Sequence, residues 1–126
     1  MNSTTYSILV PIGFSEQSLI ALEQAERLAV LTKGEITLLS VIETSGMLTR
    51  LFGEDDAQYK ELKSNLQVKL DKLAAEVSAR IGLKVNAMAS KGKVSQKIIE
   101  ASELISAKLI VMGTNGTPSE FSKKVI

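Results

Sequence analysis

The chain has 126 residues, 44% of them hydrophobic and 23% charged, which is the balance of one soluble globular domain. Lys and Arg number 15 against 14 Asp and Glu, so the net charge of +1 gives no electrostatic support to nucleic-acid or anionic-membrane binding. The chain contains no Cys and no His, which excludes disulfides, thiol catalysis, the commonest general base and the commonest transition-metal ligand.

No hydrophobic stretch approaches the roughly 20 residues that span a bilayer. The first residues, Met-Asn-Ser-Thr-Thr, lack the basic and apolar regions of a signal peptide. We therefore expect a cytoplasmic protein that binds neither membranes nor nucleic acid.

The first predicted elements are a short apolar strand over residues 6–11 and an amphipathic helix over 15–33. Ser15, with Glu16 in the first turn, predicts the start of that helix, and Gly34 is expected to cap its end. A second strand over 35–42 is rich in β-branched and apolar residues, which predicts burial on both faces.

The middle of the chain is less regular and then helical. Residues 43–56 contain an apolar cluster that predicts a lid, a contact surface or a locally folded flap. A long charged helix is expected over 55–81, with an apolar stripe that faces the core. The cluster is Met47, Leu48, Leu51 and Phe52, and the stripe is Leu62, Leu66, Leu70, Leu73 and Val77.

A third strand is predicted over 83–89, a helix over 95–106 and an apolar fourth strand over 109–112. Strands that alternate with helices in this way are typical of an open parallel α/β sheet with helices on both faces. The fold class is therefore predicted to be α/β, in a single domain.

Two loops, at residues 11–15 and 113–116, follow the carboxyl ends of predicted strands. If the first and fourth strands are neighbours, the loops face one crevice, where ligands bind in open α/β sheets. Gly113 and Gly116 allow an anion or a sugar edge to approach backbone N–H groups closely. A tight strand-to-helix turn without a ligand is the alternative. Neither a phosphate loop with its lysine nor a nucleophile–base pair is present, so no catalytic residue is assigned.

These motifs together resemble the universal stress protein family, within the adenine-nucleotide α-hydrolase-like group. The resemblance extends along almost all of the chain, and the order and spacing of its motifs carry it. They are Ile-Leu-Val-Pro-Ile-Gly-Phe-Ser-Glu from Ile8, Leu-Leu-Ser-Val-Ile from Leu38, Gly-Lys-Val from Gly92 and Leu-Ile-Val-Met-Gly-Thr-Asn-Gly from Leu109.

The resemblance implies a five-stranded sheet of order 3-2-1-4-5, homodimers that are often formed through the last strand, and a role in the stress response. One branch of the family binds ATP, so ATP (with Mg²⁺) or AMP is the implied cofactor. Carried over, the adenine and ribose pocket uses Pro11, Ile12, Gly13, Val41, Met112 and Gly113, and Gly116 begins the phosphate cradle.

The sequence departs from the family pattern at three places. Gly13 stands where the family commonly has an aspartate suited to bonding ribose hydroxyls. Ile126 stands where the second half of the glycine pattern requires a glycine. No fifth strand follows the fourth, so we expect a chain truncated at its C-terminus, in which a partner chain, a swapped segment or further residues cover the edge of residues 109–112.

The sequence thus favours a universal stress protein that regulates without catalytic turnover and binds an adenine nucleotide between the first and fourth strands. Two alternatives stay open. One is a dimeric protein-interaction module that binds no nucleotide and uses the 43–56 segment as its contact surface. The other is a slow ATP hydrolase, for which Glu120 is the available acidic residue.

Overall fold

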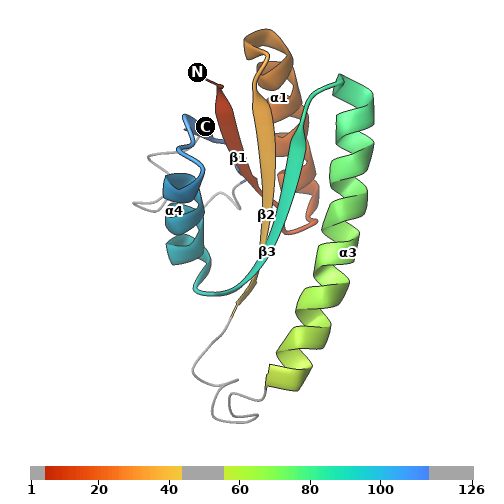
Figure 1. The fold of residues 1–126 in the computed structure, drawn as a ribbon, viewed down its shortest axis with the longest axis vertical. Coiled ribbons are helices and arrows are strands. Elements are labelled where there is room, and N and C mark those ends of the chain that lie inside the picture. The colour runs from red at the N-terminus through yellow and green to blue at the C-terminus, as the bar shows by residue number, and fades with distance from the viewer. Residues whose placement is uncertain (1–4, 44–55, 114–126) are drawn as a thin grey trace.

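In the computed structural model, residues 5–43 and 56–113 are described, and they form a parallel sheet flanked by helices (Figure 1). The strand order is β3-β2-β1-β4, and each neighbouring pair is parallel. This confirms the predicted α/β class and the order of the first four strands. The elements are β1 (Ser7–Pro11), α1 (Glu16–Thr32), β2 (Glu35–Glu43), α3 (Asp56–Ile81), β3 (Val85–Gly92), α4 (Val94–Leu104) and β4 (Leu109–Ile110).

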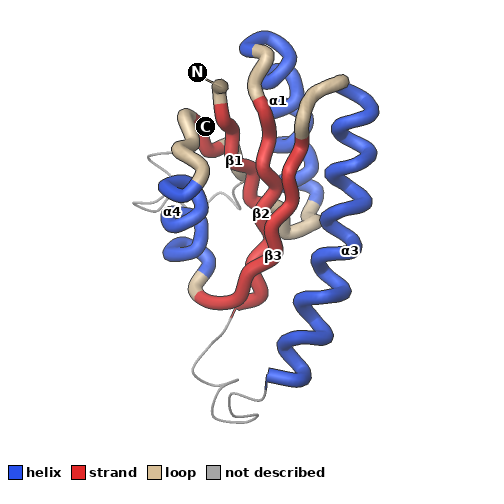
Figure 2. Tube along the Cα trace, viewed as in Figure 1, coloured by secondary structure: helices blue, strands red, loops and turns tan. Residues whose placement is uncertain are grey.

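Helices lie on both sides of the sheet, α1 and α3 on one face and α4 on the other (Figure 2). Successive residues of a strand point to opposite faces, so β1 places Ile8 and Val10 under α1 and α3 and places Leu9 under α4. All three side chains are fully buried. The continuous apolar runs of β1 and β2 therefore reflect central strands covered on both faces, which confirms the prediction made for residues 35–42.

The end of α1 differs from the prediction. Lys33, not Gly34, takes the left-handed backbone conformation that closes the helix, with φ 53°, and the N–H groups of both residues donate to the carbonyl of Ala29. Gly34 is required for another reason. A Cβ on this residue would lie 2.1 Å from the carbonyl oxygen of Tyr6, so only glycine lets the chain pass that close to the start of β1.

The long helix has nearly its predicted bounds but is less buried than predicted, and the strand after it starts and ends later than predicted. Strand β3 runs to Gly92 because it continues to pair with β2 through Glu43, although its last residues are polar. In α3, Leu70 and Val77 are fully buried, but Leu62 is 50% exposed. The first turns of α3 extend past the sheet in Figure 1, so the stripe faces the core only in its later part.

The last elements are shorter than predicted. Helix α4 ends at Leu104, and β4 contains only Leu109 and Ile110, although the N–H of Val111 still donates to the carbonyl of Leu9 at 3.0 Å. The predictions for the apolar cluster at 47–52, for Gly116, for Glu120 and for a missing fifth strand lie outside the described residues.

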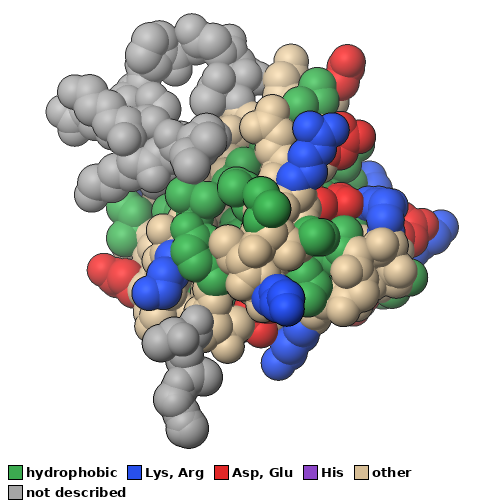
Figure 3. Space-filling model, turned by 90° about the horizontal axis from the view of Figure 1, so that it is seen from above, with side chains coloured by type: hydrophobic (Ala, Val, Ile, Leu, Met, Phe, Trp, Pro, Cys, Tyr) green, Lys and Arg blue, Asp and Glu red, His purple; other side chains and the backbone are tan. Residues whose placement is uncertain are grey.

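Acidic and basic side chains are intermingled on the face of the molecule shown in Figure 3, without a large field of one sign. This agrees with the net charge of +1. Among the described residues, no helix is both long enough and apolar enough to cross a membrane.

Candidate functional site

A cavity of about 320 Å³ lies at the carboxyl end of the sheet, between the loop after β1 and the end of β4. We call it the β1–β4 pocket. Six of the seven residues predicted to bind a cofactor line it, and Gly116 lies outside the described residues. The six are Pro11, Ile12, Gly13, Val41, Met112 and Gly113.

Six further residues line the same pocket, and the sequence did not assign them to it. They come from the start of α1, from β2 and from the start of α4, three elements that parallel topology brings to this end of the sheet. Ser15 could be recognised in the sequence as the residue that caps a helix. The other five follow the ordinary apolar and polar pattern of their helices and strands, which does not distinguish them as pocket residues. They are Ser15, Gln17, Ser18, Leu39, Val94 and Ile98.

Backbone hydrogen bonds fix the loop after β1. The N–H of Ile12 donates to the carbonyl of Leu39 at 2.7 Å, and the buried hydroxyl of Ser40 donates to the carbonyl of Ile12. Phe14 then takes a left-handed backbone conformation, φ 59°, which is unusual for a bulky residue. Its ring lies 4.2 Å from the ammonium nitrogen of Lys69 on α3, a cation–π contact that helps to hold the loop against the helix layer.

Helix α1 starts at the edge of the pocket with a well-formed cap. The hydroxyl of Ser15 accepts from the N–H of Ser18 at 3.2 Å, and the hydroxyl of Ser18 donates to the carbonyl of Ser15 at 2.9 Å. The amides of the first turn carry the positive end of the helix dipole. The sequence predicted this helix start at Ser15, and the structure confirms it.

Helix α4 starts at the same pocket, with Val94 and Ile98 in the lining. Its N-cap residue, Lys93, makes no side-chain hydrogen bond to the first turn, and no acidic residue occupies that turn. The orphan N–H groups of α4 are thus not satisfied by a side-chain cap. Two helix N-termini therefore border the pocket and favour a negatively charged group there.

The two glycines of the pocket have different structural roles. A Cβ on Gly13 would meet nothing within 4 Å, so this position has room for a larger side chain. A Cβ on Gly113 would lie 2.5 Å from the backbone carbon and oxygen of Gln17. Gly113 is therefore required by the close packing of the end of β4 against α1, whether or not a ligand binds.

The described lining residues are all uncharged. No group of three or more Asp, Glu, His or Cys residues that could hold a metal ion occurs within residues 5–43 and 56–113. The lining offers a ligand backbone N–H groups, hydroxyls, one amide side chain and apolar surface. Such a lining suits a planar base with a sugar and a small anionic group more than a highly charged ligand.

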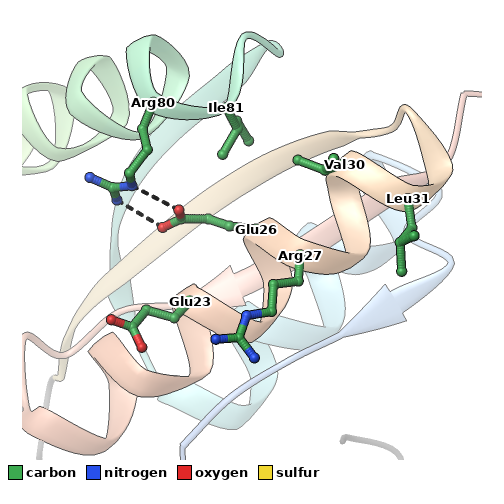
Figure 4. A pocket seen from close by; sticks show the side chains of 7 residues that line it. All are labelled: Glu23, Glu26, Arg27, Val30, Leu31, Arg80 and Ile81. Atoms are coloured by element: carbon green, nitrogen blue, oxygen red, sulfur yellow. Dashed lines mark hydrogen bonds and ion pairs between the residues drawn. The ribbon is translucent and has the colours of Figure 1, made fainter.

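A larger cavity, of about 750 Å³, lies near the opposite end of α1, between that helix and the end of α3 (Figure 4). Its main polar feature is a double hydrogen bond from the guanidinium of Arg80 to the carboxylate of Glu26, at 2.9 and 2.8 Å. The hydrogen bonds that Arg80 donates to Glu26 raise the pKa of Arg80 above its ordinary value. None of the predicted site residues lines this cavity, so size alone does not identify the functional site.

The fold agrees with solved structures of one family. A universal stress protein from Burkholderia pseudomallei is 24% identical, with a TM-score of 0.69 over 90% of this chain and 85% of that one. UspA from Lactobacillus plantarum is 20% identical, with a TM-score of 0.67 over 98% and 91%. A universal stress protein solved in complex with cAMP is 14% identical, with a TM-score of 0.67 over 96% and 84%.

A comparison with curated protein sequences finds no match. The sequence model of the universal stress protein family, by contrast, matches residues 5–123, which is nearly the whole chain. The chain belongs to the universal stress protein family.

Proposed function

We propose that the β1–β4 pocket binds an adenine nucleotide and that this protein is a nucleotide-responsive regulator without catalytic turnover. The observation that carries the proposal is the convergence of Pro11, Ile12, Gly13, Val41, Met112 and Gly113 on one cavity. These are residues that the family resemblance assigns to the adenine and ribose. The relative solved with cAMP supports the same class of ligand.

The size and charge of the pocket favour a nucleotide with one phosphate group. Its volume of about 320 Å³ is at the lower end of the range of about 300–1,000 Å³ for small-molecule sites. Two helix N-termini supply partial positive charge, but the described lining has no Lys or Arg to neutralise a triphosphate. We therefore expect AMP or a cyclic nucleotide to bind more tightly than ATP with Mg²⁺.

Binding without hydrolysis is proposed because no carboxylate belongs to the described lining. Hydrolysis of ATP requires a group that positions or activates the attacking water. If the protein instead hydrolyses ATP slowly, phosphate release will exceed that of a sample without protein and will fall in the Glu120→Gln variant. No release above that background is the result that we expect.

The first experiment identifies the ligand. Mass spectrometry of the protein as purified will detect bound adenine nucleotide, and calorimetric titration will rank AMP, cAMP and ATP. The proposal is wrong if no nucleotide is retained and millimolar concentrations of all three give neither heat nor a thermal shift. That outcome would favour a protein-interaction module that binds no nucleotide.

The second experiment adds the carboxylate that the pocket lacks. Gly13→Asp introduces a hydrogen-bond acceptor into open space, so the affinity for AMP, whose 2′ and 3′ hydroxyls are both available, should rise about tenfold. The gain for cAMP should be smaller because its 3′ oxygen is esterified. Gly13→Ala is the matched control, and it should leave both affinities unchanged.

A third pair of variants tests the location of the ligand. Val41→Phe places a larger side chain in the pocket lining. It should weaken AMP binding by a factor on the order of ten or more, because the phenyl ring would overlap the space that the ligand needs. Val68→Phe makes the same change at a site on α3 that is 67% exposed, away from the pocket, and should not alter binding. Equal effects of the two changes would count against this site.

A further inference from the structure

The outward side of α1 has an apolar residue at each end and opposite charges between them. Ile20, Glu23, Arg27 and Leu31 follow at spacings of three and four residues, which places them on one side of the helix. Ile20 is 49% exposed and Leu31 is 79% exposed, and both charged residues are exposed as well. We call this set the α1 stripe.

Figure 4 shows how the stripe differs from its neighbours. Glu23, Arg27 and Leu31 project from the same side of α1, whereas Glu26 turns toward Arg80 on α3. Glu26 is satisfied by that double hydrogen bond. Glu23 and Arg27 form no ion pair with any residue in the described part of the chain. Glu23 acts on Arg80 only at longer range, without a hydrogen bond or an ion pair, so both charges can still pair with a partner.

We propose that the α1 stripe binds a second copy of this chain, with the two α1 helices antiparallel. A two-fold axis midway between Glu23 and Arg27 places Glu23 opposite Arg27 of the partner subunit, and the reciprocal pair forms by symmetry. The same axis brings Ile20 within one residue, about 1.5 Å along the helix, of Leu31 of the partner subunit. The stripe reads apolar, acidic, basic, apolar, so it becomes its own complement when reversed.

This self-complementarity selects a second copy over other partners. An acidic or a basic partner would meet one repulsive charge for each attractive one, whereas an antiparallel copy meets only opposite charges. The cavity of about 750 Å³ beside the stripe also has an apolar wall, formed by Val30 and Ile81, against which a side chain of the second copy can pack. The contact differs from the sheet-edge dimer that the family resemblance implies.

Charge reversal tests the proposal by sedimentation velocity over a range of protein concentrations. Glu23→Arg and Arg27→Glu should each weaken the dimer at least tenfold, on the order of the effect of facing like charges in a small interface. The Glu23→Arg, Arg27→Glu double variant should dimerise as the unchanged protein does. So should an equimolar mixture of the two single variants, because arginines then face glutamates again. Glu103→Arg is the control, because it makes the same change of charge at an exposed position on α4, away from the stripe. It should leave the dissociation constant of the dimer unchanged.

Recovery in the mixture would show that the single variants are folded. A misfolded chain would not regain the ability to dimerise when it is mixed with another variant, whereas a folded chain regains its opposite charge across the contact. The proposal is overturned if the unchanged protein is monomeric at every concentration. It is also overturned if a dimer forms and both single reversals leave its dissociation constant unchanged, a result that would place the interface elsewhere.

Discussion

The side chain of Gln67 on α3 forms hydrogen bonds with two backbone groups at the free edge of β3. Its amide oxygen accepts from the N–H of Ala89 at 3.0 Å, and its amide nitrogen donates to the carbonyl of Ala87 at 3.2 Å. The side chain thus pairs with the strand as a neighbouring backbone would. Among the described strands β3 is at an edge, and unpaired edges invite association with other chains.

Gln67→Ala should lower the free energy of unfolding by about 1–2 kcal/mol, because two partly buried backbone groups lose their partners. Urea denaturation measures this loss, and light scattering should show more aggregation at high concentration. Gln96→Ala on α4, where the side chain is exposed, is the control. An equal effect of the two substitutions would contradict the role of Gln67.

At the scale of elements, the left-handed residue that ends α1 lies one position before the glycine that the sequence predicts for this role. Lys33 adopts the left-handed conformation that favours glycine, while the glycine beside it serves a close contact with Tyr6. A lysine in that conformation is strained by its Cβ.

Lys33→Gly should therefore stabilise the protein by about 0.5–1 kcal/mol, as expected when glycine replaces a strained residue at a helix end. Gly34→Ala should destabilise it, because the new Cβ would meet the Tyr6 carbonyl oxygen. Thermal denaturation of both variants separates the two roles. Loss of stability in Lys33→Gly would show that the strain is not relieved.

Helix α3 offers a second comparison within one element. Leu70 is fully buried between the helix and the sheet, whereas Leu62, eight residues earlier on the same stripe, is half exposed. Leu70→Ala should cost about 2–5 kcal/mol and Leu62→Ala less than about 1 kcal/mol. The two changes remove the same atoms. Similar losses of stability in urea denaturation would therefore mean that Leu62 is buried as Leu70 is, which would contradict its exposure in the structure.

The sequence predicted the order and type of the elements because alternating strand and helix patterns are set by local periodicity. It also predicted the β1–β4 pocket, since the carboxyl ends of neighbouring parallel strands meet at one edge. It could not predict where β3 ends, because pairing with β2 carries polar residues into the sheet. The exposure of Leu62 depends on how far α3 extends past the sheet, and local sequence does not determine that.

At the scale of the whole molecule, the β1–β4 pocket joins the two sides of the sheet. Ser18 belongs to α1 on one face and Ile98 to α4 on the other, and both line the pocket. A ligand seated there contacts both helix layers and the strand ends between them. Its binding should therefore stabilise segments that are far apart in the sequence.

Hydrogen exchange with and without AMP tests this coupling. Amides at the loop after β1, at the start of α1 and at the start of α4 should exchange more slowly with AMP bound. At a free concentration of 100 times the dissociation constant, the gain in stability is limited to about 2.7 kcal/mol, or roughly a hundredfold slowing. Amides around Glu26 that open only locally should change little, because they border the other cavity and lie outside the site. Protection confined to the cleft between α1 and α3 would instead place the nucleotide in that cavity, and protection on one face of the sheet alone would contradict a ligand held by both layers.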